Sequence, residues 1–265
     1  MSMKLIQGEC LEVMKTLPDS SIDLTVTSPP YDNLRTYNGY VFDFEGIAKQ
    51  LYRVTKEGGV VVWVVGDATI NGSETGTSFK QALYFKDVCG FSLHDTMIYA
   101  KNNYIPLTHN RYEQQFEYMF VLSKGKPRVF NALMKDNKQA GLLKGGTFRQ
   151  NKDELGKRHR DVGVAKKSIR PNIFFYNVGL HNSTNDKGAF KHPAIYPESL
   201  AHDHIISWSS EGDTVLDPMM GSGTTGKMAK ILNRKFIGIE LSKEYFDIAT
   251  RRIEDTDPLF QAVRL

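Results

Sequence analysis

The segment of residues 214–226 constrains the fold of this chain more than any other part of its sequence. An apolar run ends at Asp217 and is followed by a turn that contains Gly221 and Gly223, with Gly226 in the next helical pattern. Glycines at this spacing let the backbone turn tightly after a buried strand and leave the N-terminus of the following helix open to a ligand. The segment therefore predicts an open α/β sheet with a nucleotide-like ligand at the carboxyl ends of its strands.

The rest of the chain fits such a sheet, because strand-like and helix-like patterns alternate along it. Seven short stretches have the composition of strands: residues 4–8, 22–28, 59–66, 93–100, 116–123, 214–218 and 235–240. Helical patterns occupy residues 43–57, 77–89, 196–210, 224–233 and 242–255. Most of the strand-like stretches are apolar throughout, which is typical of strands covered by helices on both faces. We therefore predict an α/β domain with a seven-stranded, mostly parallel sheet.

Positive charge is concentrated in one stretch of the sequence. Residues 124–170 contain 14 Lys and Arg but 4 Asp and Glu, whereas the whole chain contains 34 and 30. The stretch 124–190 is also rich in Asn and Gly and fits no alternation of strands and helices. Such a long irregular segment is either a solvated loop or a functional region, for example one that neutralises the phosphates of a nucleic acid.

Cysteine content and hydropathy narrow the class of protein. Cys10 and Cys89 lie far apart and have no spacing typical of a metal or redox site, so we predict no metal and a reducing, cytoplasmic location. The longest apolar run, residues 60–65, is too short to span a bilayer, and the first residues show no signal segment. These features favour a cytoplasmic protein without membrane contact.

The glycine loop also matches most of a phosphate-binding P-loop. Gly221, Gly226 and Lys227 have the required spacing, but Met228 stands where that motif needs Ser or Thr to hold magnesium. An ATP-dependent enzyme would also need further acids to hold the ion. We therefore do not predict an ATP-binding loop.

The same glycines fit a dinucleotide-binding pattern as well. Glu240 ends the next strand 19 residues after Gly221, where an acid binds ribose hydroxyls. Asp217 argues against a pyrophosphate, because a carboxylate at the strand end would repel it and would attract a cation such as the α-ammonium group of S-adenosylmethionine. Because a glycine turn followed by an acid at the end of the next strand can bind any cofactor that contains adenosine, a nicotinamide-dependent oxidoreductase stays as an alternative class.

A second motif, Ser28-Pro29-Pro30-Tyr31, follows the strand-like run that begins at residue 22. The two prolines end the strand and stiffen the turn, so that the Ser28 side chain and the Pro29 carbonyl can face a pocket. These two acceptors can bind the N–H groups of an exocyclic amine, so that its lone pair can attack a sulfonium methyl. Tyr31 offers a ring on which an extruded base can stack. A Pro-Pro-Tyr turn by itself is usually only a surface turn. Because this chain also contains the glycine loop, we predict that the turn serves the methylation of an amine.

Together the two motifs resemble those of the β group of S-adenosylmethionine-dependent DNA amino-methyltransferases, the N4-cytosine/N6-adenine family. The resemblance covers about residues 1–125 and 190–255. It implies a Rossmann-like class I methyltransferase fold with circularly permuted motif order, since the catalytic motif precedes the cofactor loop. In that fold, residues 93–100 and 116–123 form a terminal antiparallel hairpin.

The resemblance also implies which residues form the site. The catalytic residues are Ser28, Pro29, Pro30 and Tyr31, and the cofactor-binding residues are Asp217, Pro218, Gly221, Ser222, Gly223, Thr224, Glu240, Glu9, His192 and Pro193. In the family, the position of Asp217 faces the methionine part of the cofactor, and that of Glu240 binds the ribose hydroxyls. The segment 192–197 closes over the methionine part. Glu9 stands near the adenine, where the family has Asp.

Three parts are expected: a catalytic half at residues 1–123, a basic target-recognition region at 124–190 and a cofactor-binding half at 191–265. The cofactor is S-adenosylmethionine and the partner is double-stranded DNA; a homodimer and an accompanying restriction endonuclease are left open. The expected enzyme is a site-specific DNA methyltransferase that acts on a flipped base. Serine at position 28 is typical of N4-cytosine members and aspartate of N6-adenine members, so cytosine is favoured and adenine is the alternative.

Overall fold

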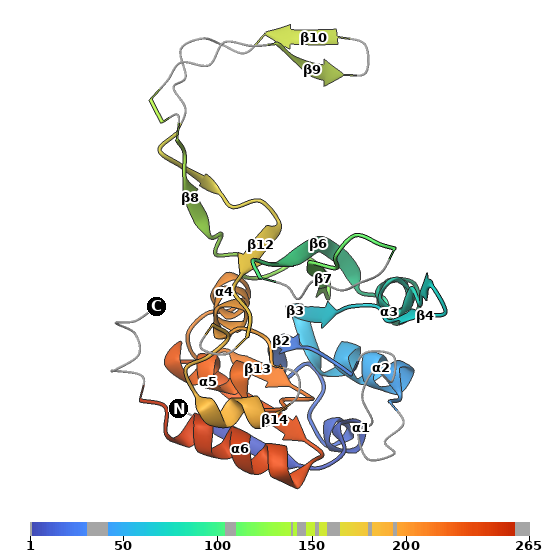
Figure 1. The fold of residues 1–265 in the computed structure, drawn as a ribbon, viewed down its shortest axis with the longest axis vertical. Coiled ribbons are helices and arrows are strands. Elements are labelled where there is room, and N and C mark those ends of the chain that lie inside the picture. Colours follow the sequence, from blue (N-terminus) through green and yellow to red (C-terminus); the bar gives the residue numbers. More distant parts are fainter. Residues whose placement is uncertain are drawn as a thin grey trace. The chain divides into compact units, whose positions relative to one another are not determined.

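The computed structural model describes most of the chain (Figure 1). The described residues are 2–30, 42–103, 110–138, 140–141, 147–151, 154–157, 165–179, 182–192 and 195–257. They form two compact units: the larger contains Met1–Asn131 and Asn172–Leu265, and the smaller contains Ala132–Pro171. Within the basic stretch 124–190, residues 132–171 thus form a unit of their own, and the rest belongs to the larger unit.

An eight-stranded sheet forms the centre of the larger unit. In spatial order its strands are β1 (Met3–Gln7), β14 (Lys235–Glu240), β13 (Thr214–Asp217), β2 (Ile22–Thr27), β3 (Thr55–Val65), β7 (Phe116–Ser123), β6 (Ser92–Lys101) and β12 (Ile173–Tyr176). β7 runs antiparallel to β3 and β6, and all other neighbouring strands pair in parallel. The start of β7 therefore lies at the same end of the sheet as the carboxyl ends of the other strands.

Helices cover both faces of this sheet (Figure 1). They are α1 (Cys10–Lys15), α2 (Phe44–Val54), α3 (Thr77–Tyr84) with its π-helical continuation η1 (Phe85–Cys89), the 3₁₀ helix η2 (Lys187–Lys191), α4 (Glu198–Trp208), α5 (Thr224–Ile231) and α6 (Lys243–Glu254). A short hairpin of β4 (Thr69–Ile70) and β5 (Ser73–Glu74) precedes α3. α2 contacts α1 and η1 on one face, whereas α4 contacts α5, β2 and β3 on the other.

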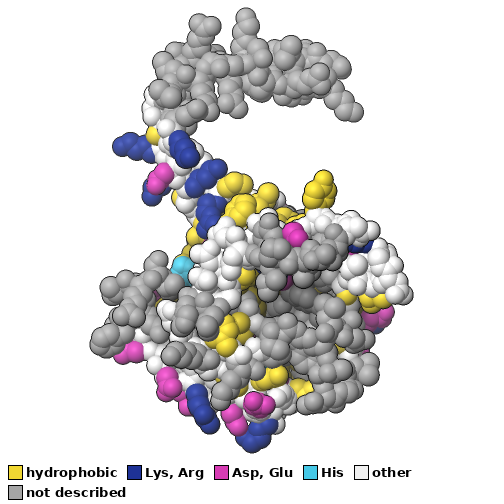
Figure 2. Space-filling view, in the orientation of Figure 1, with side chains coloured by type: hydrophobic (Ala, Val, Ile, Leu, Met, Phe, Trp, Pro, Cys, Tyr) yellow, Lys and Arg dark blue, Asp and Glu magenta, His cyan; other side chains and the backbone are white. Residues whose placement is uncertain are grey.

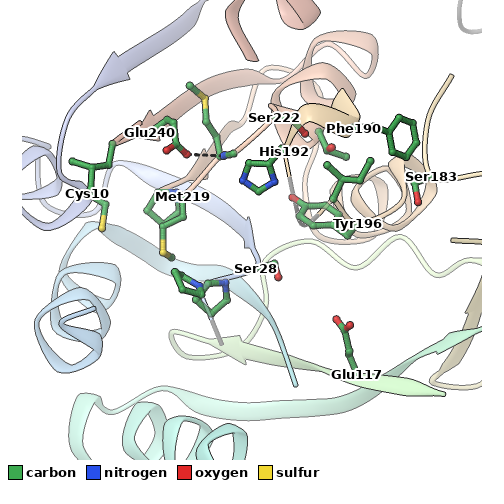
Figure 3. A pocket seen from close by; sticks show the side chains of 18 of the residues that line it. Cys10, Ser28, Glu117, Ser183, Phe190, His192, Tyr196, Met219, Ser222 and Glu240 are labelled. Atoms are coloured by element: carbon green, nitrogen blue, oxygen red, sulfur yellow. Dashed lines mark hydrogen bonds between the residues drawn. The ribbon is translucent and has the colours of Figure 1, made fainter. Parts of the chain in front are cut away.

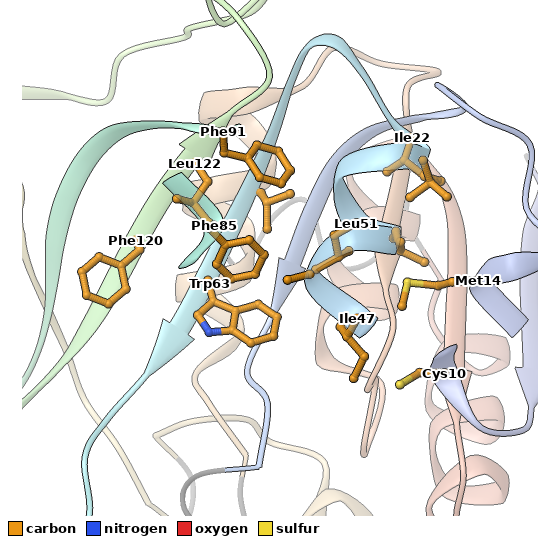
Figure 4. Close-up of a cluster of buried hydrophobic side chains, with 14 of the residues drawn as sticks. Cys10, Met14, Ile22, Ile47, Leu51, Trp63, Phe85, Phe91, Phe120 and Leu122 are labelled. Carbon is orange, nitrogen blue, oxygen red and sulfur yellow. The ribbon is translucent and has the colours of Figure 1, made fainter. Parts of the chain in front are cut away.

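A large apolar cluster lies between the sheet and the helices α1 and α2 (Figure 4). Trp63 of β3 is fully buried in it, with its ring centroid 5.1 Å from that of Phe85. The indole N–H donates to the side-chain oxygen of Gln81 at 2.8 Å, so the buried polar atom has a partner. Ile47 and Leu51 of α2 are four residues apart and fully buried, as the helical period requires of one face. This cluster fixes β3 beside β2, whose end carries the Ser-Pro-Pro motif.

The structure confirms the α/β class, the mostly parallel sheet and all seven predicted strands, but the sheet contains one strand more. β12 lies outside β6, so the β6–β7 hairpin is not terminal as predicted. The four residues of β12 alternate between exposed and buried, with Ile173 and Phe175 exposed. So short a run does not stand out from loop sequence, and its pairing with β6 supplies the stability that it lacks alone.

The helices differ from the prediction in one additional helix, α1, and in the end of α2. α1 was not predicted, because six residues show too little periodicity; Glu9 caps it by accepting the N–H of Glu12 at 2.8 Å. α2 ends at Val54 instead of residue 57, and β3 begins at the next residue, Thr55. The hydroxyl of Thr55 donates to the carbonyl of Leu51 at 2.6 Å and so closes the last turn of the helix.

The smaller unit contains two antiparallel ribbons in its described part. β8 (Met134–Asp136) pairs with β11 (Lys167–Ile169), and β9 (Thr147–Asn151) pairs with β10 (Glu154–Lys157). Residues 132–171 contain 11 Lys and Arg against 4 Asp and Glu, so most of the excess positive charge belongs to this unit. Figure 2 shows Lys and Arg side chains gathered over β8 and β11.

Two cations that precede the smaller unit have partners within the larger one. The guanidinium of Arg128 lies 3.0 Å from Asp23 and 2.8 Å from Asp213. The ammonium of Lys124 donates to the carbonyls of Tyr52 and Thr55 at 3.0 Å each. This part of the basic stretch therefore stabilises the α/β unit. None of the helices that the structure describes is long and apolar enough to cross a membrane.

Candidate active site

A cavity of about 600 Å³ opens at the carboxyl end of the sheet in the larger unit (Figure 3). Residues that directly follow β1, β2, β13 and β14 line it, together with the end of β6 and the start of β7. Open α/β sheets bind their ligands at this position, because the loops after parallel strands meet there.

The glycine loop between β13 and α5 forms one wall of the cavity. Gly221 has a φ of +50° and Gly223 a φ of +82°, a region that residues with a Cβ rarely adopt. A Cβ on Gly221 would also lie 3.0 Å from Nε2 of His192, and one on Gly223 would lie 2.9 Å from the Cβ of Ala249. Glycine at these two positions lets the loop approach the His192 segment and α6 closely.

Glu240, at the end of β14, holds the glycine loop from a second direction. Its carboxylate accepts the N–H of Gly221 at 2.9 Å and that of Ser242 at 2.8 Å. Burial raises the pKa of this carboxyl above its ordinary value, and the backbone donors oppose that shift. A carboxylate offers about four lone-pair positions, so Glu240 can still accept hydrogen bonds from the hydroxyl groups of a ligand.

Asp217 lies at the end of β13 and joins the glycine loop to β2. The hydroxyl of Thr27, the last residue of β2, donates to the carboxylate at 2.8 Å, and that of Thr225 in α5 donates at 2.8 Å. The N–H of Met219 donates as well, at 3.2 Å. Burial raises the pKa of Asp217 to about 6 despite these donors. The carboxylate thus holds together two segments that are 190 residues apart.

A buried cluster of charges lies behind the glycine loop. Lys227 of α5 is 3% exposed, and its ammonium lies 2.8 Å from Asp186 and 2.9 Å from Glu198. Arg252 of α6 pairs with the same carboxylates at 2.9 and 2.8 Å and donates to the carbonyl of Ser222 at 2.6 Å. Burial alone would raise the pKa of Asp186, but hydrogen bonds from both cations hold it below its ordinary value. The cluster ties three helices to the loop.

Replacing Lys227 with Met is expected to lower the free energy of unfolding by about 2 kcal/mol. The change leaves Asp186 and Glu198 beside a single cation, and removing one partner of a buried ion pair costs ~3–5 kcal/mol in general. The smaller value allows for Arg252, which still pairs with both carboxylates. Urea unfolding followed by circular dichroism measures the change.

Lys243→Met is the matched control for this prediction. It removes the same kind of cation from an exposed helical pair, in which the Lys243 side chain is 70% exposed and lies 2.9 Å from Asp247. We expect a change within about 0.5 kcal/mol, because exposed pairs contribute little. Equal losses in the two variants would contradict a structural role for the buried cluster.

Ser28, Pro29 and Pro30 leave the end of β2 and line the same cavity as the glycine loop (Figure 3). The hydrogen bond between Thr27 and Asp217 holds the preceding residue against that loop. The serine hydroxyl and the proline carbonyl are groups that can each accept a hydrogen bond. The fold therefore brings the two sequence motifs to one site.

Most of the predicted site residues lie around this one cavity. Those that line it are Glu9, Ser28, Pro29, Pro30, His192, Pro218, Gly221, Ser222, Thr224 and Glu240. Asp217 and Gly223 are not among the lining residues; the Asp217 carboxylate faces protein donors, where the resemblance implied a ligand. Tyr31 and Pro193 lie outside the described residues. Over the described ranges, no group of three or more His, Cys, Asp and Glu is arranged to hold a metal ion.

The cavity also has a wall that the motifs did not predict. Tyr99 and Lys101 of β6 and Glu117 of β7 line it, and so do Phe190 and Tyr196 on either side of His192. Three of these residues lie near the ends of predicted strands, which is a signal present in the sequence. That signal becomes specific only once the order of the strands in the sheet is known.

Sequence comparison places the chain among DNA methylases. The family profile described as DNA methylase (N6_N4_Mtase) matches residues 22–251. The orphan methyltransferase M.BamHII of Bacillus amyloliquefaciens is 57% identical over 244 residues, which cover 91% of this chain and 92% of that protein. The type II methyltransferase M.BglII of Bacillus subtilis is 31% identical over 266 residues, which cover 93% of this chain and 67% of that protein.

Solved structures share the fold. The PvuII DNA methyltransferase, described as cytosine-N4-specific, has a TM-score of 0.70 and 21% identity, covering 99% of this chain and 91% of that chain. The M1.HpyAVI–SAM complex has a TM-score of 0.61 and 26% identity, covering 95% of this chain and 98% of that chain. These likenesses confirm the class I methyltransferase fold.

Proposed function

The chain belongs to the N4/N6 DNA methylase family, and we propose that it methylates N4 of cytosine at specific sites in double-stranded DNA, with S-adenosylmethionine as the methyl donor. One observation carries the proposal: the Ser28-Pro29 turn and the glycine loop line the same cavity. An amine held by the one and a cofactor held by the other can therefore meet. A cavity of about 600 Å³ is within the range that small ligands and cofactors occupy.

The residues around the glycine loop fit S-adenosylmethionine. Glu240 can accept the ribose hydroxyls, because its carboxylate keeps lone pairs beyond those that bind Gly221 and Ser242. Glu9 lines the same part of the cavity, and two carboxylates there would repel the pyrophosphate of a nicotinamide dinucleotide. When bound, S-adenosylmethionine would supply a methyl group on a positively charged sulfur. The amine nitrogen would take this methyl group as the sulfur–methyl bond breaks, which leaves S-adenosylhomocysteine, and the nitrogen would then lose one proton to solvent.

Ser28 and Pro29 act on the acceptor base. The serine hydroxyl and the proline carbonyl accept the two N–H groups of the exocyclic amine, which favours a pyramidal nitrogen with an available lone pair. The turn is rigid because of its two prolines and because Thr27 is held by Asp217 at 2.8 Å. The acceleration then comes mainly from positioning, with no covalent bond between the base and the protein.

Cytosine is preferred over adenine because the first motif residue is Ser28. The family pattern associates serine at this position with N4 of cytosine and aspartate with N6 of adenine. Both are amino groups conjugated to a ring, and both serine and aspartate accept an N–H hydrogen bond. N6 of adenine is therefore the alternative acceptor.

Target recognition belongs to the segment 124–190 and chiefly to the smaller unit. The smaller unit contains 11 Lys and Arg against 4 Asp and Glu, which suits a surface that neutralises DNA phosphates. Its described part also contains the two-stranded ribbon β9–β10, and the major groove of B-DNA admits such a ribbon. The larger unit then performs the chemistry on a base extruded from the duplex.

Nucleoside analysis tests the proposed function. The purified chain is incubated with unmethylated genomic DNA and methyl-labelled S-adenosylmethionine, and the DNA is digested and analysed by mass spectrometry. We expect labelled N4-methyldeoxycytidine, and none with heat-inactivated protein. Labelled N6-methyldeoxyadenosine in its place would overturn the preference for cytosine. Absence of any methylated nucleoside would overturn the function as a whole.

A further inference from the structure

The order of the strands divides the cavity into two halves. Ser28 follows β2, which lies between β13 and β3 in the middle of the sheet. β13, β14 and β1 lie on one side of β2 and supply the glycine loop and Glu240. β7 and β6 lie on the other side and supply Glu117 and Lys101. A base whose amine is held at Ser28 therefore extends toward the second half, because the cofactor occupies the first.

Lys101 and Glu117 form an ion pair in this second half. The ammonium of Lys101 lies 2.7 Å from a carboxylate oxygen of Glu117, and the two side chains are 26% and 18% exposed. Figure 3 shows Glu117 on β7, with its carboxylate directed toward the cavity that Ser28 lines. Lys101 is the one Lys or Arg in the described lining of the cavity. Its ammonium lies 5.6 Å from the ring centroid of the buried Tyr99.

Backbone hydrogen bonds fix the end of β6, where Lys101 lies. The N–H of Lys101 donates to the carbonyl of Gln115 at 2.8 Å, and the side chain of Gln115 donates back to the carbonyl of Lys101 at 2.9 Å. On the other side, the N–H of Asn102 donates to the carbonyl of Tyr176 in β12 at 2.9 Å. The main chain at Lys101 is thus held by the neighbouring strands, and the ammonium is held by Glu117. Such preorganisation lowers the cost of ordering a side chain when a ligand binds.

We propose that Lys101 binds the ring edge of the target cytosine and that Glu117 positions it; this inference rests on the proposed function. When the N4 amine is at Ser28, the ring nitrogen N3 and the carbonyl oxygen O2 follow on the same edge of the base, and both are acceptors. The ammonium has three N–H donors, of which one binds Glu117 and two remain for N3 and O2. Adenine has a ring nitrogen beside its amine but a C–H in place of O2. The contact therefore favours cytosine.

Glu117 also balances the charge next to the reacting amine. The amine gains positive charge as it accepts the methyl group, and an unpaired ammonium nearby would oppose this step. With the carboxylate of Glu117 at 2.7 Å, the pair is neutral overall. Hydrogen bonds from a charged donor are also stronger than neutral ones. A paired ammonium can therefore orient the base without opposing its methylation.

Steady-state kinetics on a short duplex tests this role. The methylated site is first mapped by sequencing DNA that the enzyme has modified, and the target cytosine is then replaced with 3-deazacytosine, which has C–H in place of N3. Lys101→Met should lower kcat/KM on the normal duplex on the order of 10- to 100-fold, because a charged hydrogen bond is lost. Its dissociation constant for S-adenosylhomocysteine should not change. Replacing the target cytosine with the analogue should lower kcat/KM of the wild type on a similar scale. In Lys101→Met the same replacement should lower kcat/KM little further.

Further variants separate this role from a merely structural one. Lys101→Arg keeps charged N–H donors and should retain most of the activity. If Lys101→Met does not bind S-adenosylhomocysteine, Lys101→Gln is used in its place. Glu117→Gln should have a smaller effect that disappears in the Lys101→Met background, because Glu117 acts through Lys101. Lys86→Met, which removes an exposed cation paired with Asp87 at 2.9 Å, should behave as the wild type.

Two results would overturn the inference while leaving DNA methylation intact. One is an unchanged kcat/KM for Lys101→Met; the other is an equal further loss on the analogue in this variant and in the wild type. Failure of the wild type to form N4-methylcytosine overturns the proposed function itself and is seen separately by nucleoside analysis.

Discussion

Ser28→Ala is expected to lower kcat by roughly 10²- to 10³-fold, the usual effect of removing one hydrogen bond that stabilises a transition state. In the proposed mechanism the Ser28 hydroxyl accepts an N–H of the amine most strongly as the nitrogen becomes pyramidal, so its loss should act on the transition state more than on binding. Single-turnover rates on DNA measure the loss. Titration with S-adenosylhomocysteine should show an affinity within about twofold of the wild type, because Ser28 follows β2 and not the glycine loop.

Ser73→Ala is the matched control for this prediction. Ser73 lies in the exposed β4–β5 hairpin and does not line the cavity. The Ser73→Ala variant should methylate DNA at the rate of the wild type. Equal turnover by Ser28→Ala and the wild type would rule out Ser28 as the amine acceptor, whatever the other residues of the turn do.

Asp217→Ala is expected to lower the free energy of unfolding by roughly 3–5 kcal/mol near pH 5. Alanine leaves the hydroxyl of Thr27 and the N–H of Met219 without their buried acceptor, at a cost of ~1–3 kcal/mol each. It also removes the shorter of two hydrogen bonds from the Thr225 hydroxyl, which keeps the carbonyl of Val26 at 3.2 Å. Residues after Met219 line the cavity, so S-adenosylmethionine should bind roughly tenfold more weakly or worse. Urea unfolding and calorimetric titration measure the two effects.

The destabilisation by Asp217→Ala should also depend on pH. Burial raises the pKa of Asp217 to about 6 in the folded chain, whereas an aspartate in the unfolded chain titrates near ~4. Between these values the folded state binds more protons, so the stability contributed by this group is greatest below about pH 4 and falls as the pH rises through 6. The difference in unfolding free energy between wild type and variant should narrow over this range by about 2–3 kcal/mol. A difference that widens with pH would contradict the burial of this carboxyl.

The sheet and the two motifs could be predicted from the sequence because their signals are local. Residues 60–65 of β3 form a continuous apolar run, and they are almost completely buried in the fold. The glycines of the loop and the prolines after Ser28 act on their own backbone, so their meaning does not depend on distant partners. Asp217 shows the limit of such inference. Its position at the strand end was predicted, but its partners on β2 and α5 were not.

Features that depend on distant pairing could not be predicted. Lys227 resembled a phosphate-binding lysine, but its carboxylate partners are 41 and 29 residues away and follow no spacing rule. Lys101 and Glu117 carry no motif and become a pair only because β6 and β7 are antiparallel neighbours. β12 is too short and too alternating to be distinguished from a loop until β6 is there to pair with it.

The pairing of β2 with β13, which lies far away in the sequence, has a consequence for synthesis of the protein. β2 is made early, yet one of its neighbours in the sheet comes from residues 214–217, and β1 pairs with residues 236–240. A nascent chain that has not reached this region exposes the edge of β2 and has no glycine loop beside Ser28. Such late pairing slows folding, since distant segments must meet. It also means that a product of translation that stops before residue 214 lacks β13 and the glycine loop, and we expect it to have no methylation activity.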